Sequence, residues 1–159
     1  MENNNNQSEL EFTGERFMPD LINDDVMVAE HMQRYLSIAP LIKGKKIIDI
    51  ACGEGYGSEI LARSAASVTG MDISVEAVEH AAAKYRRDNL SFRVGSISDI
   101  PEENSSLDAI VSFETIEHVP EELQWDFIRE AKRVLKDEGF LVISTPNKKE
   151  YSDSFQYHN

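Results

Sequence analysis

The sequence predicts an α/β fold, a three-layer αβα sandwich on a mainly parallel sheet, and three observations lead to it. Short apolar runs alternate with helical patterns over residues 46–145, and a glycine-rich turn separates the first run from the first helix of that alternation. The chain has 159 residues and is 41% hydrophobic, which suits one domain with a buried core. Strands that alternate with helices form parallel sheets covered on both faces.

The N-terminal part is expected to lie outside that alternation. Residues 1–9 are polar and of low complexity, which is typical of a disordered tail. Residues 10–44 are predicted to form an arm followed by a helix. The helix begins at Asp24 or Asp25, because either aspartate can cap it, and it ends before Pro40.

The core domain is expected over residues 45–147, followed by a C-terminal segment over 148–159. The apolar runs predict five strands, at 46–51, 67–72, 90–95, 107–113 and 140–145. The helical patterns predict three helices, at 56–64, 74–86 and 120–136, the last ended by Gly139. The positions predicted to face the core are Val75, Val78, Ala82 and Tyr85 on the second helix, and Leu123, Phe127, Ala131, Val134 and Leu135 on the third.

The composition argues against several classes of protein. The formal net charge is −13, from 29 acidic and 16 basic residues, and a surface this acidic repels phosphate backbones and anionic lipids. Nucleic acid is therefore not an expected partner. Membrane insertion is not expected either, since no apolar stretch approaches the length of a membrane span. Cys52 is the only cysteine, which excludes an intrachain disulfide and fits the reducing cytoplasm.

Three glycines at alternate positions, Gly53, Gly55 and Gly57, stand between the first strand and its helix. Glycine forms helices poorly, so their presence there predicts that a ligand approaches the backbone closely. Asp72 ends the second apolar run, 19 residues after Gly53, where a carboxylate commonly accepts hydrogen bonds from ribose hydroxyls. A nicotinamide dinucleotide would fit these features too, but its fingerprint has the spacing G-x-G-x-x-G.

Several segments together resemble the class I S-adenosylmethionine-dependent methyltransferases. The residues DIACGEGYG (49–57) are similar to the first motif of that family, and GMDIS (70–74) to the second. GSISDIP (95–101) occupies the place of the adenine-contacting loop. Residues 107–119 and 131–147 resemble the segments around the fourth and fifth strands. The resemblance implies a Rossmann-like sandwich over most of the chain.

The family sheet has seven strands and ends in an antiparallel hairpin. This chain offers five predicted strands and no room for the last pair, so it is expected to be truncated relative to the family. The absent hairpin would leave one edge of the sheet with unpaired backbone groups. That edge predicts a homodimer.

The resemblance also implies roles for single residues. Gly53 and Gly55 lie against the methionine part of S-adenosylmethionine, Asp49 holds its ammonium group, and Asp72 holds the ribose hydroxyls. Ser96 departs from the family pattern, in which an aspartate is common. The cofactor-binding residues implied in this way are Asp49, Ala51, Gly53, Gly55, Tyr56, Asp72, Ile73, Ser96, Ile97 and Phe113.

Glu114, Glu117 and His118 stand together in the run ETIEH, after the fourth predicted strand. Three interpretations remain open. In the first, His118 and Glu114 are catalytic, and His118 removes the proton of a hydroxyl or amine as it attacks the methyl group. In the second, the two carboxylates and the imidazole bind a divalent metal ion, as the similarity to ubiquinone-pathway O-methyltransferases implies. In the third, Glu117 and His118 only shape the loop before Pro120.

The resemblance implies an enzyme that transfers a methyl group from S-adenosylmethionine to an oxygen or nitrogen of a small molecule, with S-adenosylhomocysteine as product. The segments TGERFMP and STPNKKEYSD are similar to bacterial methyltransferases associated with surface-polysaccharide assembly. A sugar or nucleotide sugar is therefore the expected acceptor. Two alternatives stand beside this hypothesis: a non-catalytic cofactor-binding fragment of a methyltransferase, and an NAD-dependent oxidoreductase.

Overall fold

The computed structural model describes residues 25–147, with side chains from residue 29 onward. The first elements are α1 (Asp25–Ile38), β1 (Lys46–Ile50), α2 (Tyr56–Ala62), β2 (Ser67–Asp72) and α3 (Val75–Lys84). They are followed by β3 (Leu90–Val94), β4 (Leu107–Phe113), a short 3-10 helix (Ile116–His118), α4 (Glu121–Val134) and β5 (Leu135–Ser144). The expected features of residues 1–24 and 148–159 lie outside the described residues.

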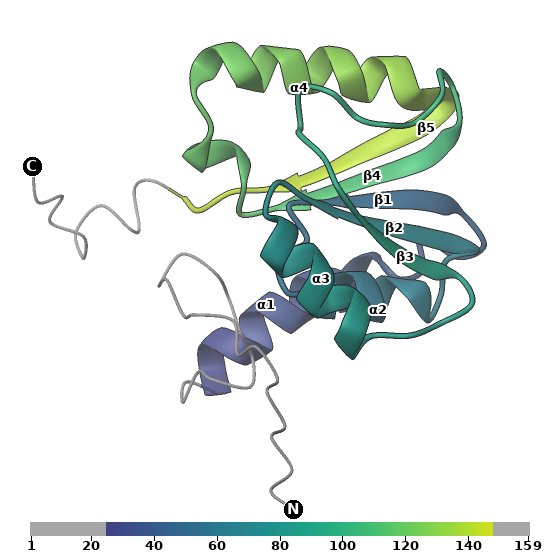
Figure 1. Ribbon diagram of the computed structural model, residues 1–159, viewed down its shortest axis with the longest axis vertical. Coiled ribbons are helices and arrows are strands. Elements are labelled where there is room, and N and C mark those ends of the chain that lie inside the picture. The colour runs from purple at the N-terminus through teal and green to yellow at the C-terminus, as the bar shows by residue number, and fades with distance from the viewer. Residues whose placement is uncertain (1–24, 148–159) are drawn as a thin grey trace, which may run out of the picture.

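The five strands form one sheet in the order β3-β2-β1-β4-β5, and every neighbouring pair is parallel. The strand order reverses between β1 and β4, so the carboxyl ends of these two strands meet at the switch point where such sheets bind ligands. Helices α1, α2 and α3 cover one face, and α4 covers the other (Figure 1). The predicted three-layer α/β sandwich is confirmed.

Each face of the sheet has its own apolar core. Ile47, Val68 and Val111 pack with α1 and α2, whereas Ile48, Ile110 and Phe127 pack beneath α4. Successive residues of β1 therefore point to opposite cores, as expected for a parallel strand covered on both sides. Within residues 25–147, no helix combines the length and apolar character that crossing a membrane requires.

The predicted inward face of α3 is wrong at three positions. Val75 is 56% exposed, Ala82 is exposed and Tyr85 is only half-buried. Instead the helix buries Ala77 and Ala81 beside Val78. The physical reason is the space available, because Ala81 packs directly beneath the glycine turn, where a larger side chain would not fit.

The boundary between α4 and the last strand also differs from the prediction. The helix ends at Val134 and β5 begins at Leu135, five residues earlier than expected. Leu135 already pairs with Leu107, and an irregularity follows before Phe140 pairs with Ala109. Gly139 lies inside this irregular stretch and does not end the helix. Pairing with β4 thus overrides the helical pattern of residues 135–136.

Candidate functional site

The turn after β1 has an unusual backbone. Its φ angle is positive at Ala51 (59°), Gly53 (54°) and Gly55 (88°), so the chain reverses direction within a few residues before α2 begins. Of these three positions, Gly53 faces open space, since no heavy atom lies within 4 Å of the place that a Cβ atom would take. Gly53 therefore leaves room for a ligand beside the backbone.

The other two glycines of the turn are required by packing within the protein. A Cβ atom on Gly55 would lie 2.7 Å from the Cβ of Ala81 and 2.8 Å from the ring of Phe92. A Cβ atom on Gly57 would collide with the ring of Tyr35. The prediction that the glycines admit a ligand is thus supported only at Gly53. Sequence could not reveal this, because the neighbouring side chains come from α1, α3 and β3.

Asp72, at the end of β2, holds the turn from the neighbouring strand. Its Oδ2 accepts a hydrogen bond from the amide of Gly53 (2.9 Å), and its Oδ1 accepts one from the amide of Ser74 (2.9 Å). Each carboxylate oxygen has a second lone pair for another donor. Because Asp72 also lines a cavity, those lone pairs are available to ligand hydroxyls.

The cavity beside Asp72 has a volume of about 200 Å³ and contains several of the predicted cofactor residues. One wall comes from the loops after β2 and β3, with Ile73, Ser96 and Ile97. The opposite wall includes His118 and comes from the segment that leads into α4. Ile73 is 77% exposed at the rim, an apolar side chain that a flat aromatic ligand would cover.

Asp49, in β1, is fully buried. Ser58 donates a hydrogen bond from Oγ to Oδ2 of Asp49 (2.6 Å), whereas Oδ1 has no partner among the described residues. Burial raises the pKa of this carboxyl from 3.8 to about 7, with the Ser58 hydrogen bond opposing the rise. A buried carboxylate oxygen without a donor provides a place for a cationic group.

A second group of polar and aromatic side chains gathers where β4 ends. Glu114 has a φ of 52° and accepts a hydrogen bond from Ser144 Oγ (2.7 Å), and its carboxylate lies 3.6 Å from Arg34 Nε. The ring of Tyr35 meets those of Tyr56 and Phe113 edge to face, with centroids 5.5 and 4.9 Å away.

Helix α1 supplies a further polar contact on this side. His31 Nδ1 lies 3.4 Å from the Tyr56 hydroxyl, and burial lowers the pKa of His31 below its usual value. On α1, His31 and Tyr35 thus contact Tyr56 of α2, while Tyr35 and Arg34 also reach the end of β4. The sequence did not predict these contacts, because helical periodicity does not say which neighbouring elements the polar side chains will meet.

The run ETIEH is divided between two surroundings. Glu114 faces Ser144 and Arg34, as described above, while His118 lies on the cavity wall with its side chain 76% exposed. Glu117 Oε1 is 4.0 Å from His118 Nε2. Between residues 25 and 147, no three side chains of the metal-ligating kinds gather at one point. The geometry therefore brings His118 together with the cofactor residues rather than with both glutamates.

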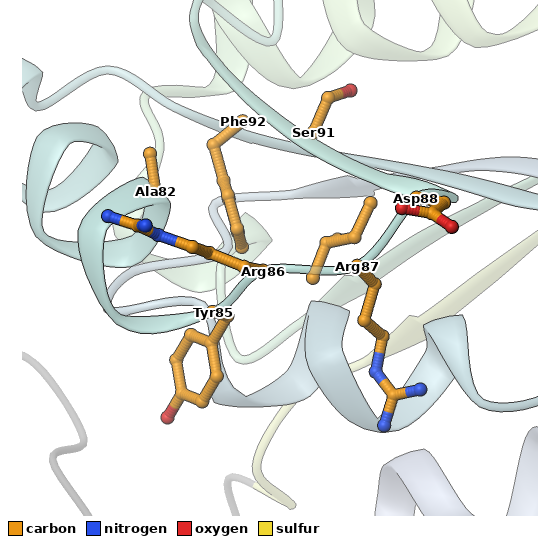
Figure 2. Close-up of a pocket in the computed structure, with 8 residues that line it drawn as sticks. Ala82, Tyr85, Arg86, Arg87, Asp88, Ser91 and Phe92 are labelled. Atoms are coloured by element: carbon orange, nitrogen blue, oxygen red, sulfur yellow. The ribbon is translucent and has the colours of Figure 1, made fainter.

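Another cavity, of about 320 Å³, lies between the end of α3 and the start of β3 (Figure 2). Arg87, at its margin, is engaged by Glu59, whose Oε1 accepts from Nε and Nη2 at 2.9 and 2.7 Å. Tyr85 and Arg86 lie along its side (Figure 2). β3 begins here, so this cavity lies at the amino end of that strand rather than at the carboxyl ends of the strands, where the glycine turn lies.

Comparisons with known sequences agree on one protein family for this chain. A family model described as "Methyltransferase domain" matches residues 48–143. A Mycolicibacterium smegmatis protein named as an S-adenosylmethionine-dependent methyltransferase is 34% identical over 91% of this chain and 55% of its own length. A ubiquinone biosynthesis O-methyltransferase of Actinobacillus pleuropneumoniae is 36% identical over 66% of this chain and 47% of its own. The chain spans about half the length of the curated relatives that it matches.

Solved structures show the same fold. A Pyrococcus horikoshii protein superposes with a TM-score of 0.69 at 27% identity, covering 83% of this chain and 64% of that protein. The methyltransferase in a complex with the Haloferax volcanii Trm112 activator superposes with a TM-score of 0.63 at 29% identity, covering 70% of this chain and 50% of its own.

Proposed function

The chain belongs to the class I S-adenosylmethionine-dependent methyltransferases, and from that premise we propose that it transfers a methyl group to an oxygen or nitrogen of a small molecule. One observation carries the proposal: the open face of Gly53, the carboxylate of Asp72 and the cavity between Ile73 and Ile97 adjoin one another at the switch point. They match in order the amino-acid, ribose and adenine parts of S-adenosylmethionine, the cofactor of this family.

The bound cofactor supplies a methyl group on a positively charged sulfur. The residues of this chain would then position the reactants: Asp72 orients the ribose, and Asp49 faces the ammonium group. An acceptor hydroxyl or amine must lose its proton during the attack. We assign the removal of that proton to His118, which lies on the cavity wall. Glu114, directly after β4, is proposed as a second catalytic residue.

The acceptor is proposed to be a sugar or nucleotide sugar, on the sequence similarity noted above. The relative named as a ubiquinone biosynthesis O-methyltransferase supports oxygen as the methylated atom. The net charge of −13 favours a small acceptor over nucleic acid, and the single cysteine favours action in the cytoplasm. A non-catalytic cofactor-binding module is the second candidate, since the chain spans about half of its relatives.

The first test is calorimetric titration with S-adenosylmethionine, S-adenosylhomocysteine and NAD, followed by a screen of sugars and nucleotide sugars for release of S-adenosylhomocysteine. Binding of both sulfur compounds without NAD, and turnover with an acceptor, would support the proposal. Binding without turnover across the screen would favour the non-catalytic module. Binding of NAD alone would favour an oxidoreductase and contradict the proposal.

Replacing His118 with asparagine is expected to lower kcat by about 100-fold with the acceptor that the screen identifies, because a positioned base contributes on that order. Affinity for S-adenosylhomocysteine should stay within about threefold, as the side chain is mostly exposed. Glu122→Gln, on the exposed first turn of α4, is the matched control and should keep full activity. An unchanged kcat in His118→Asn would assign His118 a structural role, and loss of wild-type activity with a chelator would favour the metal interpretation.

The edge of β5 is proposed to join two copies of the chain. Among residues 25–147, β5 has β4 as its only neighbour, which leaves one row of backbone groups unpaired. Light scattering over a wide concentration range is expected to show a rise from 18.0 kDa toward twice that mass. A mass that stays at 18.0 kDa at every concentration would contradict this proposal.

A further inference from the structure

Glu54 carries a buried charge in the middle of the glycine turn. It stands between Gly53 and Gly55, and only 2% of its surface is exposed. A carboxylate in such a turn would ordinarily point into solvent, since burying an ionised group is costly unless it is paired. Its side chain is absent from the walls of the cavity beside Asp72 and is directed toward α3 instead. Glu54 therefore does not belong to the ligand-contacting set described above.

Helix α3 supplies the groups that face Glu54. Lys84 Nζ donates a hydrogen bond to Oε2 of Glu54 at 2.9 Å. His80 Nε2 lies 3.5 Å from the same oxygen, too far or poorly aligned for a hydrogen bond. The other oxygen, Oε1, is buried without a partner among the described residues. The carboxylate thus depends mainly on Lys84 for its compensation.

The same helix contacts the turn next to Glu54. Ala81 occupies the space beneath Gly55, and Asp72 accepts the hydrogen bond from Gly53. Three consecutive residues of the turn are therefore held from outside, Gly53 by β2 and the next two by α3. Of these contacts, the ion pair is the one formed by a side chain of the turn itself.

We propose that Glu54 is a positioning residue for the cofactor: through its ion pair with Lys84 it holds the turn so that Gly53 stays open to the ligand and bonded to Asp72. The inference rests on the proposed function, because the cofactor must lie against Gly53. An inward-facing side chain thereby fixes the orientation of the backbone that meets the amino-acid part of the ligand. The adenosine part, which contacts Asp72 and the cavity, depends on Glu54 much less.

The test compares two ligands that differ in the part facing Gly53. Glu54→Ala is expected to weaken binding of S-adenosylhomocysteine by about tenfold to thirtyfold, because a supporting contact loosens the site. Binding of adenosine, which lacks the amino-acid part, should change by less than about threefold. A purely structural defect would weaken both ligands equally, since it lowers only the fraction of folded protein.

Matched variants keep the experiment decisive. Lys84→Arg preserves the charge and should bind S-adenosylhomocysteine like the wild type, whereas Glu79→Ala removes an exposed acid from the same helix and should change neither affinity. If Glu54→Ala does not fold, Glu54→Gln keeps the size of the side chain and should show the same difference between ligands, smaller in extent.

Two results would overturn the inference: unchanged affinity for S-adenosylhomocysteine in both Glu54 variants, or an equal loss for both ligands. Failure of the proposed function is a different result, since the wild type would then not bind S-adenosylhomocysteine at all.

Discussion

Replacing Asp72 with alanine is expected to weaken the binding of S-adenosylhomocysteine by about 100-fold, because the variant would lose the two charge-assisted hydrogen bonds to the ribose that we propose. Asp72 lies at the carboxyl end of β2 and is 92% buried, with 8% of its surface exposed toward the cavity. Its carboxylate also accepts hydrogen bonds from Gly53 and Ser74, so the variant loosens the turn as well as the ribose site.

Calorimetric titration checks this prediction, and circular dichroism confirms that each variant is folded at the temperature used. Asp72→Asn is the companion variant, since its amide oxygen still accepts one hydrogen bond and its loss should be smaller. Adenine, which lacks the ribose, should bind wild type and variants with similar affinity. Unchanged affinity for S-adenosylhomocysteine in Asp72→Ala would place the ribose elsewhere and contradict the assignment of the cavity.

The sequence predicted the sheet well because buried parallel strands are short apolar runs with little ambiguity. The bounds of β2 and β4 agree with the predicted runs, and Ser74 caps α3 by accepting a hydrogen bond from the amide of Ala77. The errors arose where one element meets another. Which face of α3 is inward depends on the space beneath the glycine turn, and the start of β5 depends on pairing with β4.

The same distinction applies to the site. Resemblance to the motifs of the family predicted the family, which the comparisons confirm, and pointed to Asp49, Gly53 and Asp72, which the fold brings to one end of the sheet. It did not predict that Gly55 and Gly57 serve packing, or that Ser58 binds Asp49. The residues in these contacts are not spaced at the repeat of a helix or of a strand, so periodicity in the sequence does not reveal them. They result from the way in which α1, α2 and α3 pack against the sheet.

Glu54 is an instructive case because its sequence context indicates the wrong surroundings. A glutamate between two glycines looks like a solvent-exposed turn residue, and its burial becomes visible only with α3 in place. Arg34 and Ser144 gave no signal at all. Both approach Glu114 from elements that are distant in sequence.

Asp49→Asn is expected to have opposite effects on stability and on cofactor binding. Burial raises the pKa of Asp49 in the folded protein to about 7, above its value of 3.8 in a model peptide. The folded state therefore retains a proton that the unfolded state releases, and the stability of the ligand-free protein falls as pH rises from about 4 to about 7. Above pH 7 the variant lacks this buried charge and should be more stable than the wild type by roughly 2–4 kcal/mol.

Denaturant unfolding at several pH values checks the stability half of this prediction. The advantage of Asp49→Asn should be largest above pH 7, shrink between pH 7 and pH 4, and vanish only well below pH 3.8, where the wild-type carboxyl is neutral in both states. Equal stability of the two proteins at pH 8 would mean that the carboxylate has compensation that the structure of residues 25–147 does not contain.

Binding should change in the other direction, since a site that favours function often costs stability. Asp49→Asn is expected to bind S-adenosylhomocysteine about tenfold to thirtyfold more weakly at pH 8, because it lacks the carboxylate that we propose to face the ammonium group. Wild-type affinity should fall as pH drops through about 7 and Asp49 takes up a proton, whereas the variant should show little change there. Burial lowers the pKa of His31 from 6.5, and Asp49→Asn keeps His31, so loss of the pH dependence in this variant would exclude His31 as its source.

Ser58→Ala provides the control that ties both effects to one carboxyl. The hydroxyl of Ser58 stabilises the ionised form of Asp49, so its removal should raise the pKa of Asp49 further. In Ser58→Ala the fall in affinity should then begin at a higher pH than in the wild type, while the affinity at pH 9 stays close to that of the wild type. A pH profile that is the same in wild type, Ser58→Ala and Asp49→Asn would show that Asp49 does not face the ammonium group. A profile that moves upward in Ser58→Ala and is lost in Asp49→Asn would identify Asp49 as the titrating group, because the two substitutions act on the same carboxyl in different ways.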